Sequence, residues 1–216
     1  MKIKAASGND RGQETGKSDE WNKSMKYPWR NTVNQWGLVS IFNHWLMALA
    51  ILANFFLGYW MVGLDYYDTW YHQGPEIHKS IGGVLMILMA FRLSWMLFSA
   101  SAMPLPNHRN WEIILAKIVK WLLLISLFII LMSGYLMSTI EDQGIDVFHL
   151  FQIPATFKLF EENKDLLGDL HWYVALFMMG LVLLHAMAAL KHHLIDKDRT
   201  FLRILWPNLM TQTEKK

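Results

Sequence analysis

The sequence predicts an all-α fold, a transmembrane four-helix bundle, on the basis of two observations. Hydrophobic residues make up 53% of the 216 residues. They gather in four blocks of about 17 to 25 residues, the length that crosses a bilayer as a helix: 38–62, 81–98, 121–137 and 171–190. The third and fourth blocks also lack the polar stripe at helical spacing that a helix of a soluble bundle carries. Four buried helices of a soluble protein are therefore the weaker interpretation.

Few polar residues interrupt these blocks. The second block carries one charged residue, Arg92, and the third is entered through Lys117 and Lys120. The fourth has no Asp, Glu, Lys or Arg, yet it contains His171 and His185. An unsatisfied polar group in the hydrocarbon core costs several kcal/mol. Each of these imidazoles is therefore expected to have a partner inside the bundle.

The segments outside the blocks differ in charge. Lys and Arg number seven in residues 1–37, three in residues 99–120 and six in residues 191–216. Segments 65–79 and 141–169 together hold three Lys against ten acidic residues. Cationic flanks stay on the cytoplasmic side of a membrane. Both termini are therefore predicted to be cytoplasmic, and the second and fourth spans to begin on the outer side.

The chain has no cysteine. This excludes disulfides, iron–sulfur clusters held by cysteine and the covalent attachment of haem through C-x-x-C-H. Residues 1–35 lack the apolar core of a signal peptide and are predicted to form a disordered, basic cytoplasmic tail. Residues 36–207 then form the four-helix domain and residues 208–216 a cytoplasmic C-terminal tail. Membrane lipid is an expected partner, and nucleic acid is not.

Four of the nine histidines fall at two depths of the predicted bundle. His171 and His185 are 14 residues apart, which is about 21 Å along a helix and about 40° short of four full turns, so both lie on one face. His44 lies about 10 Å into the first span from the inner side, at the level of His185. His78 opens the second span at the outer side, at the level of His171.

Two pairs of histidines from different helices are the arrangement needed to hold two flat cofactors stacked across a bilayer. Neutral imidazole binds haem iron, and two imidazoles satisfy both faces of the ring. The bundle is therefore predicted to hold two b-type haems, an inner one on His44 and His185 and an outer one on His78 and His171. The alternative is hydrogen bonding of these histidines between helices. A carboxylate-bridged metal site is disfavoured because no Asp or Glu lies within a block.

Several other residues are interpreted by their distance from the two predicted haem levels. Arg92 follows His78 by 14 residues, which predicts a buried cation beside a propionate of the inner haem; the alternative is a side chain that reaches the inner surface. Glycines in the second and third spans would let helices or a ring approach closely, namely Gly82, Gly83 and Gly134. The remaining histidines are expected to be solvated or at headgroup level: His72, His108, His149, His192 and His193.

Four stretches resemble, in order and spacing, the bacterial cytochrome b561 family of the inner membrane: FNHWLMALAILANFFLGYWM, IHKSIGGVLMILMAFRLSW, LISLFIILMSGYLMS and HWYVALFMMGLVLLHAMAALKHHLIDKDRTFLRILWP. The resemblance covers about residues 36–207. It implies a four-helix bundle with two b haems on the histidine pairs above, which passes electrons between a periplasmic donor and membrane quinone. Some members resemble a superoxide oxidase that reduces ubiquinone. Relatives often have histidines at the start of the third span, where this chain has Lys117 and Lys120, so a proton-handling role there is not expected.

Iron with imidazole on both faces has no open position for oxygen, which suits transfer of electrons rather than oxygen chemistry. We therefore expect electron transfer across the membrane, which the resemblance specifies as transfer across the inner membrane to ubiquinone from a periplasmic protein or from superoxide. Lys79, a cation in an acidic outer rim, is a candidate for attracting superoxide. One rival is a cytochrome b subunit of a hydrogenase or dehydrogenase complex, docked through segment 141–169. Another is a membrane scaffold or binding protein without redox chemistry.

Overall fold

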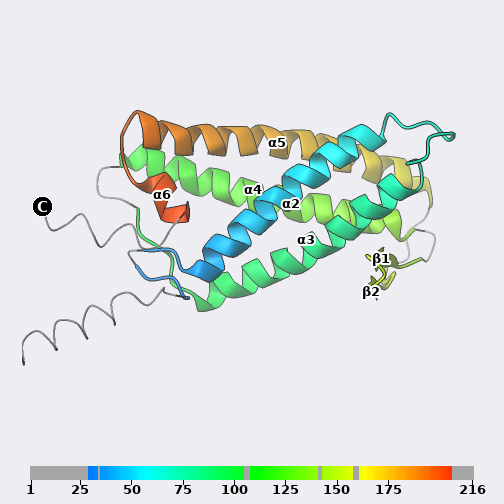
Figure 1. Cartoon of the computed structure of the whole chain (residues 1–216), viewed down its shortest axis with the longest axis horizontal. Helices are drawn as coiled ribbons and strands as arrows, with labels where there is room; N and C mark the ends of the chain where they lie inside the picture. The colour runs from blue at the N-terminus through cyan, green and yellow to red at the C-terminus, as the bar shows by residue number, and fades with distance from the viewer. Residues whose placement is uncertain (1–28, 34, 105–107, 141–142, 158–160, 206–216) are drawn as a thin grey trace, which may run out of the picture.

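A computed structural model describes residues 29–33, 35–104, 108–140, 143–157 and 161–205. Four long helices run along the long axis of the molecule (Figure 1). They are α2 (Leu38–Met61), α3 (Gln73–Phe98), α4 (Asn110–Ser138) and α5 (Lys164–Leu194). The shorter elements are the strands β1 (Ile145–Val147) and β2 (Phe151–Ile153), the 3₁₀ turn η1 (Glu161–Asn163) and the helix α6 (Thr200–Leu205).

The four predicted spans are confirmed, since all four long helices are long and apolar enough to cross a membrane. Three of them begin earlier than the apolar blocks do: α3 at Gln73, α4 at Asn110 and α5 at Lys164. Polar residues at a helix end are compatible with the headgroup region and can complete the first turn. In α4 the carboxylate of Glu112 accepts a hydrogen bond of 3.0 Å from the backbone N–H of Arg109. Apolar composition therefore underestimates the length of these helices.

The helices pack in two antiparallel pairs, α2 with α3 and α4 with α5. One end of the bundle, where α2 begins and α6 lies, is called here the α6 end; the opposite end, where β1 and β2 lie, is the hairpin end (Figure 1). A buried apolar cluster joins all four helices: Met47, Leu85, Met89, Leu127, Leu131 and Met178. Because Met178 is midway along α5 between His171 and His185, this cluster separates the two histidine levels.

The hairpin of β1 and β2 was not predicted. Its strands pair antiparallel, with Ile145 opposite Ile153. The Ser80 hydroxyl of α3 donates to the Asp146 carbonyl at 3.0 Å and accepts from the Phe148 N–H at 3.2 Å. Each strand has three residues, too few to show an alternating pattern in the sequence.

The segment before α2 and helix α6 both attach to the bundle at the α6 end. Asn31 accepts a hydrogen bond of 2.9 Å from the Gly37 N–H and donates one of 3.0 Å to the Ala100 carbonyl. The Trp45 indole donates to the Ile204 carbonyl at 2.9 Å. The predicted tails lie mostly outside the described residues, which lack 1–28 and 206–216; of the predicted N-terminal tail, residues 29–33 and 35 are described.

Candidate functional site

The structure brings the four span histidines together in two pairs. At the α6 end, the ring centres of His44 in α2 and His185 in α5 are 6.3 Å apart, with an interplanar angle of 62°. At the hairpin end, those of His78 in α3 and His171 in α5 are 6.1 Å apart, at 69°. Three of these side chains are half-buried and His185 is exposed. The proximity expected from helical depth is thus present at both levels.

The ring separation is informative about what each pair can hold. In the described part of the chain, no hydrogen bond joins the two rings of a pair, so the two histidines of a pair do not serve as each other's partners. When two imidazoles bind one metal ion from opposite sides, each metal–nitrogen bond is about 2 Å long. Adding the distance from each nitrogen to its own ring centre puts the two ring centres about 6 Å apart. The clusters of three or more metal-binding side chains in the described residues lie elsewhere. Two imidazoles alone suit a cofactor that supplies the other ligands itself, as haem does.

The tautomer of His171 is determined by its contacts. Its Nδ1 lies 3.0 Å from the Ile130 carbonyl oxygen and 3.1 Å from the Ser133 hydroxyl in α4. A carbonyl oxygen can only accept, so Nδ1 carries the proton. The lone pair is then on Nε2. A metal-binding histidine is commonly oriented by such a bond from its second nitrogen.

At the hairpin end, two glycines leave space that the histidine rings occupy. A Cβ atom on Gly58 of α2 would lie 2.9 Å from Cε1 of His78, and one on Gly134 of α4 would lie 3.0 Å from Cε1 of His171. Both distances are shorter than ordinary contacts between carbon atoms. Of the three glycines noted in the sequence, Gly134 lies against a histidine ring. Gly83 instead admits Val147 of the hairpin, at 2.7 Å, and Gly82 meets nothing within 4 Å.

The two cations of interest lie at opposite levels. Arg92 is a half-buried residue of α3 within electrostatic range of His44. Its guanidinium makes no hydrogen bond or ion pair with the described residues. Lys79 is exposed at the hairpin end beside His78. These positions agree with the levels expected from the sequence.

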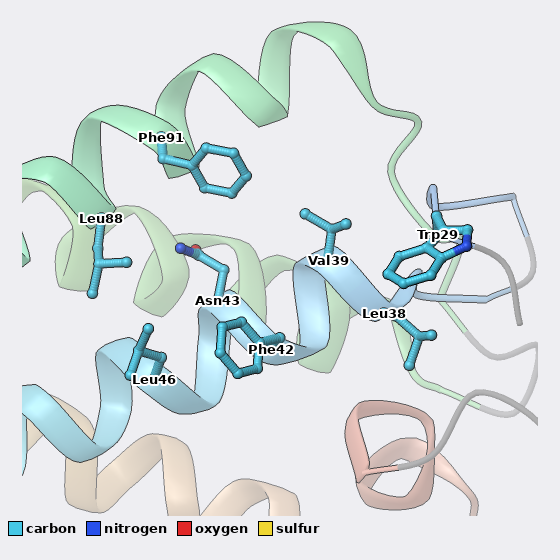
Figure 2. A pocket seen from close by; sticks show the side chains of 8 residues that line it. All are labelled: Trp29, Leu38, Val39, Phe42, Asn43, Leu46, Leu88 and Phe91. Atoms are coloured by element: carbon cyan, nitrogen blue, oxygen red, sulfur yellow. The ribbon is translucent and has the colours of Figure 1, made fainter.

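An apolar pocket of about 470 Å³ opens between α2 and α3 at the α6 end (Figure 2). Its lining consists of Trp29, Leu38, Val39, Phe42, Asn43, Leu46, Leu88 and Phe91. Asn43 contributes the only polar side chain among these and is 4% exposed. Its Oδ1 has no hydrogen-bond partner in the described residues. Phe42 is exposed on the outer face of α2, so the pocket is open to an apolar ligand from the lipid side.

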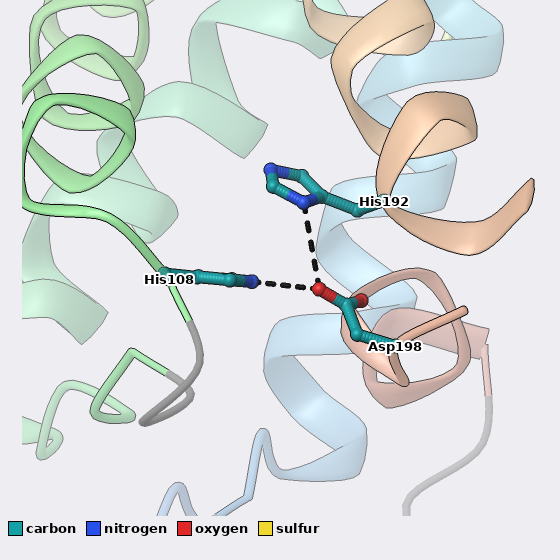
Figure 3. Close-up of side chains that lie close together, drawn as sticks. All are labelled: His108, His192 and Asp198. Atoms are coloured by element: carbon teal, nitrogen blue, oxygen red, sulfur yellow. Dashed lines mark hydrogen bonds and ion pairs between the residues drawn. The ribbon is translucent and has the colours of Figure 1, made fainter. Parts of the chain in front are cut away.

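A polar cluster at the α6 end contains His108 and His192, which were expected to be solvated or at headgroup level. Each side chain is only 14% exposed, and both contact the carboxylate of Asp198 (Figure 3). The sequence did not predict this contact, because it arises where α5 continues to Leu194 and a helical turn places His192 facing the segment before α4. His72 and His149 are exposed, as expected, and His193 is half-buried.

The acidic residues of this cluster are held in the ionised form. Hydrogen bonding from Lys191 lowers the pKa of Asp196 below its ordinary value. Burial alone would raise the pKa of Asp198, but hydrogen bonds from Thr200 and His108 outweigh it and lower the pKa. Both carboxyl groups are therefore negatively charged at neutral pH.

Comparison with known proteins adds two matches. A family model described as prokaryotic cytochrome b561 matches residues 35–207, a range that contains all four long helices and α6. Cytochrome b561 homolog 2 of Escherichia coli (strain K12) is 42% identical over 175 residues, which cover 81% of this chain and 93% of that protein.

Proposed function

Because the chain belongs to the prokaryotic cytochrome b561 family, we propose that this membrane cytochrome carries electrons across the inner membrane through two b-type haems. One observation carries the proposal: two histidine pairs, with ring centres 6.3 Å and 6.1 Å apart, lie at two levels of one apolar bundle. Along α5 the two levels are about 21 Å apart, which is most of the thickness of a hydrocarbon core.

The ligands are assigned by these pairs. His44 and His185 would bind the haem at the α6 end, and His78 and His171 the haem at the hairpin end. When bound, haem would supply one-electron oxidation and reduction, and the two imidazoles of each pair would hold its iron. Ser133 and the Ile130 carbonyl hold Nε2 of His171 free for iron.

Two other features of the chain support the same assignment. The guanidinium of Arg92, which has no ion-pair partner among the described residues, would pair with a haem propionate at the α6 end, because a half-buried charge needs an opposite charge. The apolar cluster around Met178 keeps water out of the space between the two levels.

We further propose that the electron acceptor is ubiquinone, with its headgroup in the pocket at Asn43. The headgroup is flat and apolar with two carbonyl oxygens, and the tail is lipid-soluble. The Asn43 amide could donate to a quinone carbonyl or accept from a quinol hydroxyl. The neighbouring residue along α2 is His44, so this pocket adjoins the ligand of one proposed haem.

The donor is proposed to act at the hairpin end, where Lys79 is exposed beside His78. For superoxide, each anion would lose one electron and leave as dioxygen; two such electrons and two protons reduce one ubiquinone to ubiquinol. A periplasmic protein donor, or a partner hydrogenase or dehydrogenase, is the alternative. Co-purification of a partner subunit would favour the latter.

Haem and iron assays per chain on the purified protein, with a reduced-minus-oxidised visible spectrum, test the central proposal. Two haems per chain with six-coordinate b-type bands are expected. A protein without haem would support the scaffold alternative.

A substitution tests the quinone pocket: Asn43→Leu should slow quinone reduction while haem content stays at two. Asn54→Leu is the matched control, because Asn54 is another α2 asparagine whose Oδ1 has no hydrogen-bond partner in the part of the chain that the structure describes, and it does not line the pocket.

A further inference from the structure

Two segments far apart in the sequence, one before α4 and one from the end of α5 to α6, meet at the α6 end of the bundle (Figure 3). His108 precedes α4, His192 lies in the last turn of α5, and Asp198 lies in the turn before α6. Oδ2 of Asp198 is 2.8 Å from Nε2 of His108 and 3.4 Å from Nδ1 of His192. The two imidazole ring centres are 4.6 Å apart. Two ring nitrogens therefore converge on one carboxylate oxygen.

Two acidic residues beside this cluster, Glu112 and Asp196, already have a cationic partner. Lys191 Nζ lies 2.7 Å from Glu112 and 2.8 Å from Asp196. The Asp198 side chain is only 9% exposed and makes no ion pair with Lys or Arg in the described part of the chain. A carboxylate that two imidazoles face is a donor set that divalent metals bind.

We propose that His108, His192 and Asp198 form a binding site for a divalent transition metal of the Zn²⁺ type. Bonds of about 2 Å at tetrahedral angles put ligand atoms about 3 Å apart, which agrees with the 2.8 Å and 3.4 Å separations. The ligands are Nε2 of His108, Nδ1 of His192 and Oδ2 of Asp198, and water completes the set. His192 Nδ1 also lies 2.7 Å from Asp196, a bond that metal binding replaces.

Thr200 orients the site. Its backbone N–H donates to Oδ1 of Asp198 at 2.8 Å, which turns Oδ2 toward the imidazoles. A hydrogen bond of this kind to the second oxygen of a carboxylate ligand is typical of metal sites. The Thr200 hydroxyl lies 3.1 Å from Nε2 of His108, a contact that metal binding would replace. A metal here would join the start of α4 to the turn before α6, and so fasten the α6 end independently of haem.

The test uses full-length protein with the purification tag removed and Zn²⁺ alone as the probe. Bound zinc per chain is measured after equilibrium dialysis, and haem per chain is measured on the same samples. One tight Zn²⁺ per chain is expected. His108→Gln and Asp198→Asn should weaken zinc binding by at least about tenfold. The controls His149→Gln and His193→Gln change histidines outside the site and should bind as the parent protein does.

Two further measurements do not depend on the folding of a variant. X-ray absorption at the zinc edge of the parent protein should show two imidazoles among nitrogen and oxygen ligands, and Zn²⁺ should raise its Tm because it binds the folded state. The proposal is overturned if the parent protein binds no tight zinc, or if the His108 and Asp198 variants bind it as well as the controls do. Loss of haem without loss of zinc would count against the proposed function alone.

Discussion

Individual glycines determine how closely a histidine ring approaches a neighbouring helix. A methyl group on Gly134 would stand 3.0 Å from His171, and one on Gly58 would stand 2.9 Å from His78. Either ring would have to move away, and with it the nitrogen that is proposed to bind iron. These two positions affect the hairpin-end haem specifically, because neither contacts His44 or His185.

We therefore expect Gly58→Ala and Gly134→Ala to lower the content of the hairpin-end haem while the other haem is kept. Alanine favours a helix over glycine by up to about 1 kcal/mol, so the loss would not come from a weaker helix. Haem per chain and low-temperature spectra of each variant measure it. Gly82→Ala, where the new methyl group meets nothing within 4 Å, is the control. Two intact haems in the Gly134 variant would contradict the proposed geometry.

Arg92 provides a second prediction at the residue scale, because its charge lies within range of His44. A positive charge stabilises the reduced, less positive iron, so Arg92→Gln should lower the potential of the α6-end haem. An interaction of about 1.4 kcal/mol corresponds to about 59 mV for one electron, so a shift of tens of millivolts is expected in a redox titration. Arg92→Lys keeps the charge and should shift less. Equal shifts at both haems would argue against a specific contact.

A substitution of Lys79 tests whether superoxide is the electron donor. If the Lys79 charge attracts superoxide, Lys79→Gln should slow haem reduction by superoxide at low salt. The difference should shrink as ionic strength rises, since the Debye length is about 8 Å at physiological salt. Lys117→Gln removes the same charge at the α6 end and is the control. An unchanged rate at every ionic strength would exclude Lys79 as the attracting group, and a wild-type protein that superoxide does not reduce would favour a protein donor.

At the scale of elements, α5 contributes one histidine to each level, while α2 and α3 contribute the others. A six-coordinate site fails when either ligand is lost, so effects within a pair should not add. We expect His44→Ala and His185→Ala each to remove the α6-end haem, and the double variant to lose nothing more. His78→Ala should instead remove the hairpin-end haem. The pairing would be wrong if the His44 and His78 variants emptied the same site, as judged by haem counting.

The same elements show what sequence reasoning could and could not reach. Span number and histidine depth follow from two fixed lengths, the thickness of a bilayer and the rise of a helix, and so the proximity of His44 to His185 could be predicted. The hairpin could not, because its contacts with Ser80 and Gly83 come from a segment more than sixty residues away. His108 and His192 meet for a similar reason, through the turn before α6. Tertiary contacts of polar loops leave no periodic signal.

The sequence pointed to close approach at three glycines but not to the group that approaches, which is a histidine ring at Gly134 and the hairpin at Gly83. It did not single out Ser133 or Asn43. A serine or asparagine in an apolar helix is common, and only the position of His171 or of the pocket distinguishes these two from others in the spans. Exposed large apolar side chains on the outer faces, such as Phe56 and Phe128, are what a protein surrounded by lipid requires.

The whole molecule has two unlike ends, and its orientation in the membrane decides which of them meets the donor. The excess of Lys and Arg near the α6 end predicts that this end is cytoplasmic. The chain has no cysteine, so single cysteines can report the orientation. Leu150→Cys places a thiol in the hairpin turn, at a residue that is 81% exposed, and Ser101→Cys places one at an exposed position of the α6 end.

In intact spheroplasts, a membrane-impermeant maleimide should label Leu150→Cys and leave Ser101→Cys unlabelled until the membrane is opened. The two variants control for each other, because both thiols should react in detergent. The reverse pattern would put Lys79 and the His78–His171 pair on the cytoplasmic side. The spacing of the two pairs would be unaffected, since it depends on the helices alone, but superoxide on the periplasmic side would then face the α6 end, and the donor proposed for Lys79 would have to be abandoned.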